Sequence, residues 1–333
     1  MLVGSVKQLF LCSLLLPLLV HSWNSVKSIE LVAPITGPSL TDCSPTSCWD
    51  ADLAIPLLVG PDLYVFEGDV SVKGECDNNP RMPNAVGFSN GSAVLNWNEF
   101  PTQAASLQYG LPVSFFPLLG ASTVPAGALL VADTVFMFMM NVSAWNSGQP
   151  GDVEANGMLV QGGWSQYADS KGSTVFPTFD PTPLWATPTN ELMCNVAPVS
   201  PPGNPDTIYL FTTGYYRISA VYLATVVTTS LSVLIQYQYL SGLDGSSPIW
   251  STNTSQAIPL FTDTVGVGEV SAMWIDSIAQ FVLSYFSYDA EGAGALFFRF
   301  GAEPWGPWSN PLAVLDETFQ PSWYQSGWCC PYG

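Results

Sequence analysis

The sequence predicts an all-β protein built from antiparallel β-sandwiches. Apolar stretches of five to ten residues, rich in Val, Phe, Tyr and Thr, recur along the 333-residue chain. The 28 Pro and 28 Gly residues are spread evenly between them and mark turns. No long segment shows helical periodicity. Short strands separated by turn residues are typical of all-β domains.

The chain begins with an export-signal-like leader over residues 1–22. Lys7 precedes an apolar run from Leu9 to Val20, and small residues stand at Val20 and Ser22. This run has 12 residues, whereas about 20 are needed to span a bilayer. The pattern predicts a secretory signal peptide and no stable membrane span. A buried strand or helix at the start of a domain is the alternative.

Two sets of strands follow the leader. The first set is predicted at Leu63–Val72, Ala93–Trp97, Ala128–Met140 and Met158–Trp164. The second set is predicted at Thr207–Phe211, Tyr215–Thr228, Leu231–Leu240, Val270–Ile275, Gln280–Tyr288 and Ala295–Gly301. Each segment is rich in β-branched or aromatic residues, which favour pleated sheets.

Several of these strands are apolar on both faces. In Gln280–Tyr288, the residues Phe281, Leu283 and Tyr285 alternate with Val282 and Phe286. Successive side chains of a strand point to opposite faces, so we expect such strands to be buried on both sides. One face would form a sandwich core, and the other would meet a second layer or a neighbouring subunit.

Proline clusters divide the chain. Four prolines fall between Val196 and Pro205, which indicates a linker. We therefore predict a β-sandwich domain at 30–195, a linker at 196–205 and a second domain at 206–302. Residues 303–333, with four Trp among prolines, predict an extended aromatic tail that straps the surface.

Charge excludes one class of partner. Beyond residue 22 the chain holds six basic and 26 acidic residues, and its single His, His21, lies in the leader. Such an acidic surface repels phosphate backbones, so nucleic acid is not an expected partner. A chain without imidazole also lacks the side chain that most often moves protons near neutral pH.

Cysteines, acidic residues and sequons supply the candidate sites. An even number of Cys in an exported chain predicts up to three disulfides without fixing their connectivity, and reduced buried thiols are the alternative. The candidates are Cys43, Cys48, Cys76, Cys194, Cys329 and Cys330. Asp42, Asp50 and Asp52 are weak candidates for a structural calcium ion, and no other cofactor is predicted. Sequons place candidate glycosylation sites at Asn90, Asn141 and Asn253.

Enzyme signatures are weak. Gly87–Gly91 matches the G-x-S-x-G pattern of nucleophile elbows, but no His follows, and a turn between strands explains it better. Glycosidase chemistry needs two carboxylates and no His. The pairs Glu67/Asp69, Glu75/Asp77 and Asp289/Glu291 are available for it. With 26 acidic residues such neighbours are inevitable, so we predict no enzyme and no catalytic residues.

Part of the second domain resembles a known fold. The segments FTTGYYRISAVYLA (211–224), QFVLSYFSY (280–288) and ALFFRFG (295–301) resemble core strands of the trimeric jelly-roll heads in the tumour necrosis factor and complement-head superfamily. Similar jelly rolls form the projecting domains of tombusvirus-like coat proteins. The resemblance covers 209–301 and implies a jelly-roll domain. The chain lacks the basic amino-terminal arm of such coat proteins.

These observations lead to a functional hypothesis. We expect a non-enzymatic, self-assembling surface protein, a capsid or projecting attachment component of a virus particle. It would form a homo-oligomer, a trimer or larger, at the virion surface or outside the cell, and its loops would contact a host glycan or receptor. A secreted lectin-like or adhesin module is the alternative, and a His-independent secreted glycosidase is a third. Host, ligand, symmetry and disulfide pairing are left open.

Overall fold

The computed structural model describes residues 49–60, 62–72, 82–89, 115–146, 152–169, 172–201, 203–263, 266–288 and 294–315. It confirms the all-β class. The described part contains strands and three single-turn 3₁₀ helices, η2 (Thr228–Ser230), η3 (Leu234–Gln236) and η4 (Thr254–Gln256). None of the helices in these ranges is long and apolar enough to cross a membrane.

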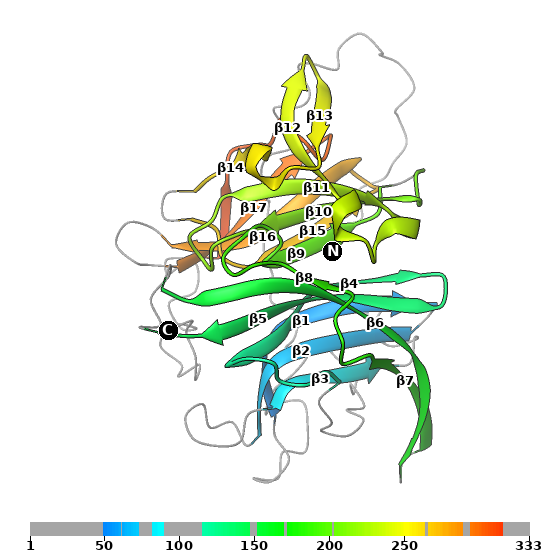
Figure 1. Cartoon of the computed structure of the whole chain (residues 1–333). Helices are drawn as coiled ribbons and strands as arrows, with labels where there is room; N and C mark the ends of the chain where they lie inside the picture. Colours follow the sequence, from blue (N-terminus) through cyan, green and yellow to red (C-terminus); the bar gives the residue numbers. More distant parts are fainter. Residues whose placement is uncertain are drawn as a thin grey trace.

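The strands form four antiparallel sheets in chain order (Figure 1). The first contains β1 (Trp49–Val59), β2 (Asp62–Val72) and β3 (Met82–Ser89). The second contains β4 (Ser122–Val131), β5 (Thr134–Ala144), β6 (Glu154–Asp169), β7 (Gly172–Phe179) and β8 (Trp185–Ala186). The third contains β9 (Asn195–Val199), β10 (Thr207–Thr213), β11 (Val221–Val227), β12 (Gln238–Asp244), β13 (Ser247–Ser251) and β14 (Pro259–Phe261). The fourth contains β15 (Val270–Ile275), β16 (Gln280–Tyr288), β17 (Gly294–Gly301) and β18 (Leu312–Leu315).

Neighbouring strands within each sheet are consecutive in sequence. Only β8, which pairs with β6, and β14, which pairs with β11, depart from this order in the described part of the chain. A jelly roll instead pairs strands that are distant in sequence. The jelly-roll part of the expected fold is therefore not the observed topology.

Successive sheets pack face to face. Tyr64 and Phe66 of the first sheet pack with Met137 and Met139 of the second. Phe138, between those two methionines, lies in another cluster with residues of β10 and β11. Adjacent residues of one strand thus serve two interfaces, as the two-sided apolar pattern predicts. A third cluster joins residues of β10 and β11 to β15 and β16, so the third sheet also packs against the fourth.

The first strand of each sheet lies innermost in this series. β1 contacts β4, β4 contacts β9, and β9 contacts β15. Glycine allows one of these approaches, because a Cβ atom on Gly127 of β4 would lie 2.3 Å from the carbonyl oxygen of Val196 on β9. At Gly127 the backbones of β4 and β9 are therefore closer than a residue with a side chain would permit.

Gly157 on β6 is the tightest such position. A Cβ atom there would lie 1.6 Å from the carbonyl oxygen of Met193, whereas one on Gly163 of the same strand would meet nothing within 4 Å. We expect Gly157→Ala to lower the free energy of unfolding by about 3 kcal/mol, because the backbone at Met193 or Gly157 must shift to make room for the added methyl group. Gly163→Ala is the matched control and should change it by less than about 1 kcal/mol. Urea unfolding followed by tryptophan fluorescence measures both, and equal effects would contradict this packing.

Most predicted strands are present, with three differences in the described part. The segment 128–140 is a hairpin, because the chain turns at residues 132–133 between β4 and β5. Of 215–228, only 221–227 is a strand. The predicted strand at 231–240 contains η3 and the start of β12. Buried apolar residues in short helical turns and loops have the same composition as strand residues, so the sequence pattern alone did not separate them.

The structure describes parts of the predicted linker and of the predicted aromatic tail. Residues 196–199 of the predicted linker belong to β9, which pairs with β10. The division into two domains stays a prediction. In the tail, Trp305 and Trp308 pack on the cluster between the third and fourth sheets. The predicted strand at 93–97 and the tail beyond residue 315 lie outside the described residues.

Candidate functional site

Three of the innermost strands begin close together. Asn195 opens β9, and its side-chain oxygen accepts a hydrogen bond of 3.2 Å from the backbone N–H of Val270, which opens β15. Cys194, one residue before β9, shares a buried cluster with Val124, the third residue of β4. The starts of β4, β9 and β15 therefore meet at one end of the inner strands. We call this place the inner-strand end.

The loop 214–220 between β10 and β11 is held at this end. The backbone N–H of Gly214 donates to Oγ of Ser219 at 2.8 Å, and Val267 N–H donates to the Ser219 carbonyl at 2.8 Å. Gly266 approaches the loop so closely that a Cβ atom would lie 2.4 Å from Cα of Ile218. Arg217 has φ +59°, a left-handed conformation that is uncommon for a residue with a side chain. These contacts therefore hold the loop in one conformation and fix the direction of the Arg217 side chain.

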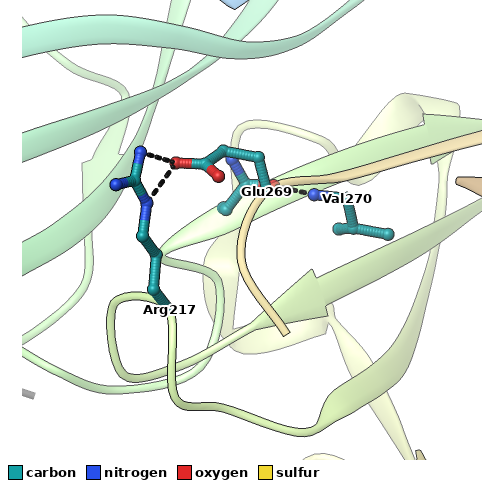
Figure 2. Close-up of polar contacts among 4 residues, drawn as sticks. Arg217, Glu269 and Val270 are labelled. Carbon is teal, nitrogen blue, oxygen red and sulfur yellow. Dashed lines mark hydrogen bonds and ion pairs between the residues drawn. The ribbon is translucent and has the colours of Figure 1, made fainter. Parts of the chain in front are cut away.

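Arg217 forms an ion pair with Glu269, the residue before β15 (Figure 2). Nε and Nη2 of Arg217 donate to the same oxygen, Oε1, at 3.1 and 3.0 Å. The side chains are 9% and 18% exposed, so the pair is largely desolvated. The guanidinium also lies 4.7 Å from the centre of the Tyr216 ring. Within the described part of the chain, no hydrogen bond reaches Oε2 of Glu269, so this oxygen stays available.

Polar and aromatic side chains surround the inner-strand end. Thr123 donates to Asn141, and Asn141 donates to Asn156, each at 3.1 Å, across β4, β5 and β6. Trp145 follows β5, is 38% exposed and packs its ring edge-on against Tyr216 at 5.7 Å. Hydrogen-bonding amides beside an exposed indole suit a polyhydroxylated ligand with an apolar face.

A pocket of about 460 Å³ lies against the same loop. Tyr215, Ile218 and Ser219 line it, whereas Tyr216 is buried and Arg217 points to Glu269. One short loop therefore contributes both to the ion pair and to the pocket wall.

Cys194 is a free, buried thiol beside this site. Burial raises its pKa to about 12, and the negative charge of Glu269 adds to the shift. Such a thiol stays protonated and unreactive at neutral pH. Cys194 forms no disulfide within the described residues, and its predicted bridge stays a prediction.

Buried acids with raised pKa values predict alkaline destabilisation. Desolvation raises the pKa of Cys194, Tyr64 and Tyr239 to about 12, from ordinary values of 9.0 for the thiol and 10.0 for the phenols. Above pH 9 the unfolded chain loses protons that the folded chain retains, so the free energy of unfolding falls as pH rises. Urea unfolding at pH 8 and pH 10.5 tests this. Cys194→Ala should show a smaller fall between them, and a pH-independent midpoint would contradict the assignment.

The described residues test only part of the predicted site set. Asp50 and Asp52 lie in β1, and their side chains are not described. Asn141 is half-buried and hydrogen-bonded within its sheet, whereas Asn253 is exposed before η4. The other members of that set lie outside the described residues: Asp42, Cys43, Cys48, Cys76, Asn90, Cys329 and Cys330. The carboxylate pairs Glu67/Asp69, Glu75/Asp77 and Asp289/Glu291 have no described side chain. No group of three or more His, Cys, Asp or Glu gathers in the parts that are described.

Sequence reasoning missed Arg217 and Glu269 as a pair. A signal existed, because Arg217 is one of six basic residues beyond the leader and stands inside an apolar segment. A charge in such a segment needs a partner. The partner is 52 residues away in sequence, and only the fold brings it near.

The sequence matches one protein family. A family model described as "Domain of unknown function (DUF4185)" matches residues 51–332. The chain belongs to this family. No curated protein is significantly similar to the DUF4185 chain.

Solved structures extend the comparison. A Bacteroides ovatus protein described as a "putative hydrolase" is similar with a TM-score of 0.52 and 11% identity, over 81% of this chain and 71% of that one. At this identity the likeness shows the fold. A Clostridium thermocellum α-L-arabinofuranosidase has a TM-score of 0.43 and 10% identity, over 81% and 74% of the two chains. A Phanerochaete chrysosporium exo-β-1,3-galactanase has 0.44 and 10%, over 79% and 50%.

These findings correct the functional hypothesis. The resemblance of 209–301 to tumour necrosis factor-type heads and tombusvirus-like domains is wrong, because those residues contribute to two sheets of consecutive strands. The prediction of a non-enzymatic virion or capsid protein is wrong with it, since the chain shares its fold with the Bacteroides ovatus protein described as a "putative hydrolase". The lack of His does not support a non-catalytic role, because carboxylates suffice for some hydrolyses. Self-association and an extracellular location stay predictions.

Proposed function

We propose that the protein is a glycoside hydrolase with a propeller-like arrangement of sheets. Its reaction would take place at the inner-strand end, with Glu269 as one of two catalytic carboxylates. The observation that carries this proposal is the desolvated Glu269, held through Oε1 by Arg217 while Oε2 stays available. Glycoside hydrolysis needs carboxylates and no imidazole, which suits a chain without His beyond residue 21.

Three features of the sheets support a propeller-like arrangement. Each sheet consists of consecutive antiparallel strands, which is how a propeller blade is built. The first strands contact one another in the order β1, β4, β9 and β15. Each sheet packs its face on the next one through a buried cluster. A site at one end of the inner strands then receives side chains from several blades.

The Arg217 ion pair indicates the role of Glu269. The carboxylate forms a charge-assisted contact of 3.0 Å with the Arg217 guanidinium. An ionised carboxylate acts as a base toward water or as a nucleophile toward the anomeric carbon, while a second, protonated carboxyl group donates to the leaving oxygen. We therefore assign Glu269 as the base or nucleophile.

The start of β1 would supply the second carboxylate. Asp52 pairs with Gly68 of β2, and a Cβ atom on Gly68 would lie 2.7 Å from Cβ of Val124 near the start of β4. β1 therefore begins beside the inner-strand end, and Asp50 and Asp52 lie in this first part of the strand. These two residues are also the calcium candidates that lie in a strand. Bound calcium stays a proposal and would compete with a role as general acid.

A substrate screen tests the proposed function. The full chain is incubated with 4-nitrophenyl glycosides of neutral pentoses and hexoses and with neutral oligosaccharides, with calcium or with a chelator. We expect one sugar class to be hydrolysed and Asp50→Asn or Asp52→Asn to reduce that activity. A folded protein that hydrolyses no member of the panel, or hydrolyses it equally well after Glu269→Gln, would overturn the proposal.

A further inference from the structure

The pocket beside the loop 214–220 is distinct from the ion pair, because neither Arg217 nor Glu269 lines it. Three segments form it: the loop before β9, the loop 214–220 with the start of β11, and the 3₁₀ helix η4. Its volume of about 460 Å³ is in the range of small-molecule sites. The residues that bear on its chemistry are Glu191, Tyr215, Ser219, Tyr222, Thr254 and Ser255.

The lining combines an aromatic face with oxygen atoms. Tyr215 is 45% exposed, so much of its ring is open to a ligand, and Tyr222 is half-buried in β11. Glu191, Thr254 and Ser255 are exposed and present carboxylate and hydroxyl oxygens. A sugar ring offers C–H groups to an aromatic face and hydroxyl groups to such oxygens.

The charge of the pocket selects among ligands. No lysine, arginine or histidine is among its lining residues, and Glu191 is acidic. Arg217 lies on the same loop 214–220 as Tyr215, but its side chain pairs with Glu269 and does not line the pocket. The whole chain has a formal charge of −19. An anionic sugar would meet repulsion without a compensating cation, whereas a neutral sugar would not.

We propose that this pocket is a sugar-binding subsite for a neutral sugar unit, separate from the sugar attacked at Glu269. Its place in a substrate chain rests on the proposed function, because the fixed loop 214–220 joins the two sites. Tyr215 supplies the stacking surface, and Glu191, Thr254 and Ser255 accept from sugar hydroxyl groups. Binding to the pocket needs no turnover, so the two proposals can fail separately.

Binding is measured by titration calorimetry with xylotriose, cellotriose and β-1,3-galactotriose, and with trigalacturonate as the anionic counterpart. The protein carries Glu269→Gln to prevent hydrolysis. We expect at least one neutral trisaccharide to bind and Tyr215→Ala to weaken it about ten-fold through loss of stacking. Thr254→Trp, which fills the pocket from exposed η4, should abolish it. Met273→Ala removes an exposed side chain that does not line the pocket and should leave binding unchanged.

The possible outcomes distinguish the sugar-binding subsite from the proposed hydrolase activity. No binding of any trisaccharide, or binding unchanged by both Tyr215→Ala and Thr254→Trp, overturns the subsite. Tighter binding of trigalacturonate overturns the neutral ligand class. If the variants lose binding while the wild-type chain hydrolyses nothing, the subsite holds and the proposed hydrolase does not. If hydrolysis of 4-nitrophenyl glycosides survives Tyr215→Ala while the KM for trisaccharides rises, both hold.

Discussion

Glu269→Gln is expected to reduce glycoside hydrolysis by roughly 10²–10⁴-fold, the range that a positioned acid–base group contributes. The substitution keeps the size of the side chain and removes its charge. Oε1 of the carboxylate accepts from two nitrogens of Arg217 at 3.0–3.1 Å, and an amide oxygen retains only part of that attraction. The rate loss should appear in kcat, because the carboxylate acts on the reacting bond and not on the remote sugar units.

Stability must be followed in the same variant. The Arg217 side chain is 9% exposed, so loss of its counter-ion should lower the free energy of unfolding by about 1–3 kcal/mol. That loss leaves the chain folded, and thermal melting checks it. Asp133→Asn, in the exposed turn between β4 and β5, is the control for losing one carboxylate and should keep full activity. An inactive but fully folded Glu269→Gln beside an active Asp133→Asn is the expected result. Full activity of Glu269→Gln would remove Glu269 from the reaction.

Arg299→Ala is expected to lower the free energy of unfolding by about 3–5 kcal/mol, because it removes two hydrogen bonds from a charged donor and leaves a cavity at a buried position. Arg299 lies on β17 and is 8% exposed. Its Nε donates to the Tyr285 hydroxyl at 3.0 Å, and its Nη1 donates to the carbonyl of Ser309 at 2.7 Å. Its guanidinium lies 4.3 Å from the centre of the Phe261 ring.

This contact network connects two sheets. The Tyr285 hydroxyl of β16 donates to Oδ2 of Asp263, which follows β14 of the third sheet, at 2.7 Å. Truncation of Arg299 therefore leaves Tyr285 and the Ser309 carbonyl without their donor and removes the cation above Phe261. The same change would also open a void between β14, β16 and β17.

Two variants separate charge from shape at this position. Arg299→Lys keeps the positive charge but loses the planar guanidinium, so it should recover only part of the stability. Tyr285→Phe removes one hydroxyl from the network and should cost about 1–2 kcal/mol. Chemical denaturation of all three variants measures these differences. A loss below about 1 kcal/mol for Arg299→Ala would show that the network contributes little.

The class of the fold was readable from local sequence. The expectation that apolar strands are buried on both faces applies to the predicted strand Ala128–Met140, where Val135, Met137 and Met139 alternate with Phe136 and Phe138. The structure confirms it, since Met137 and Met139 face the first sheet while Phe138 faces the third. Burial on both faces is a property of a single strand, so a short sequence window contains it.

Sheet partners and the site were decided by tertiary structure. Tyr215–Thr228 had the composition of one long strand, yet hydrogen bonds from Gly214 and Val267 to Ser219 make its first half a fixed loop. That loop turns Arg217 toward a carboxylate 52 residues away. The sequence by itself thus determined an acidic, His-poor, all-β chain with strands buried on both faces. Only the tertiary structure decided which sheets pack against each other and that Arg217 pairs with Glu269. Both depend on contacts between segments that are distant in sequence, and a short sequence window does not contain such contacts.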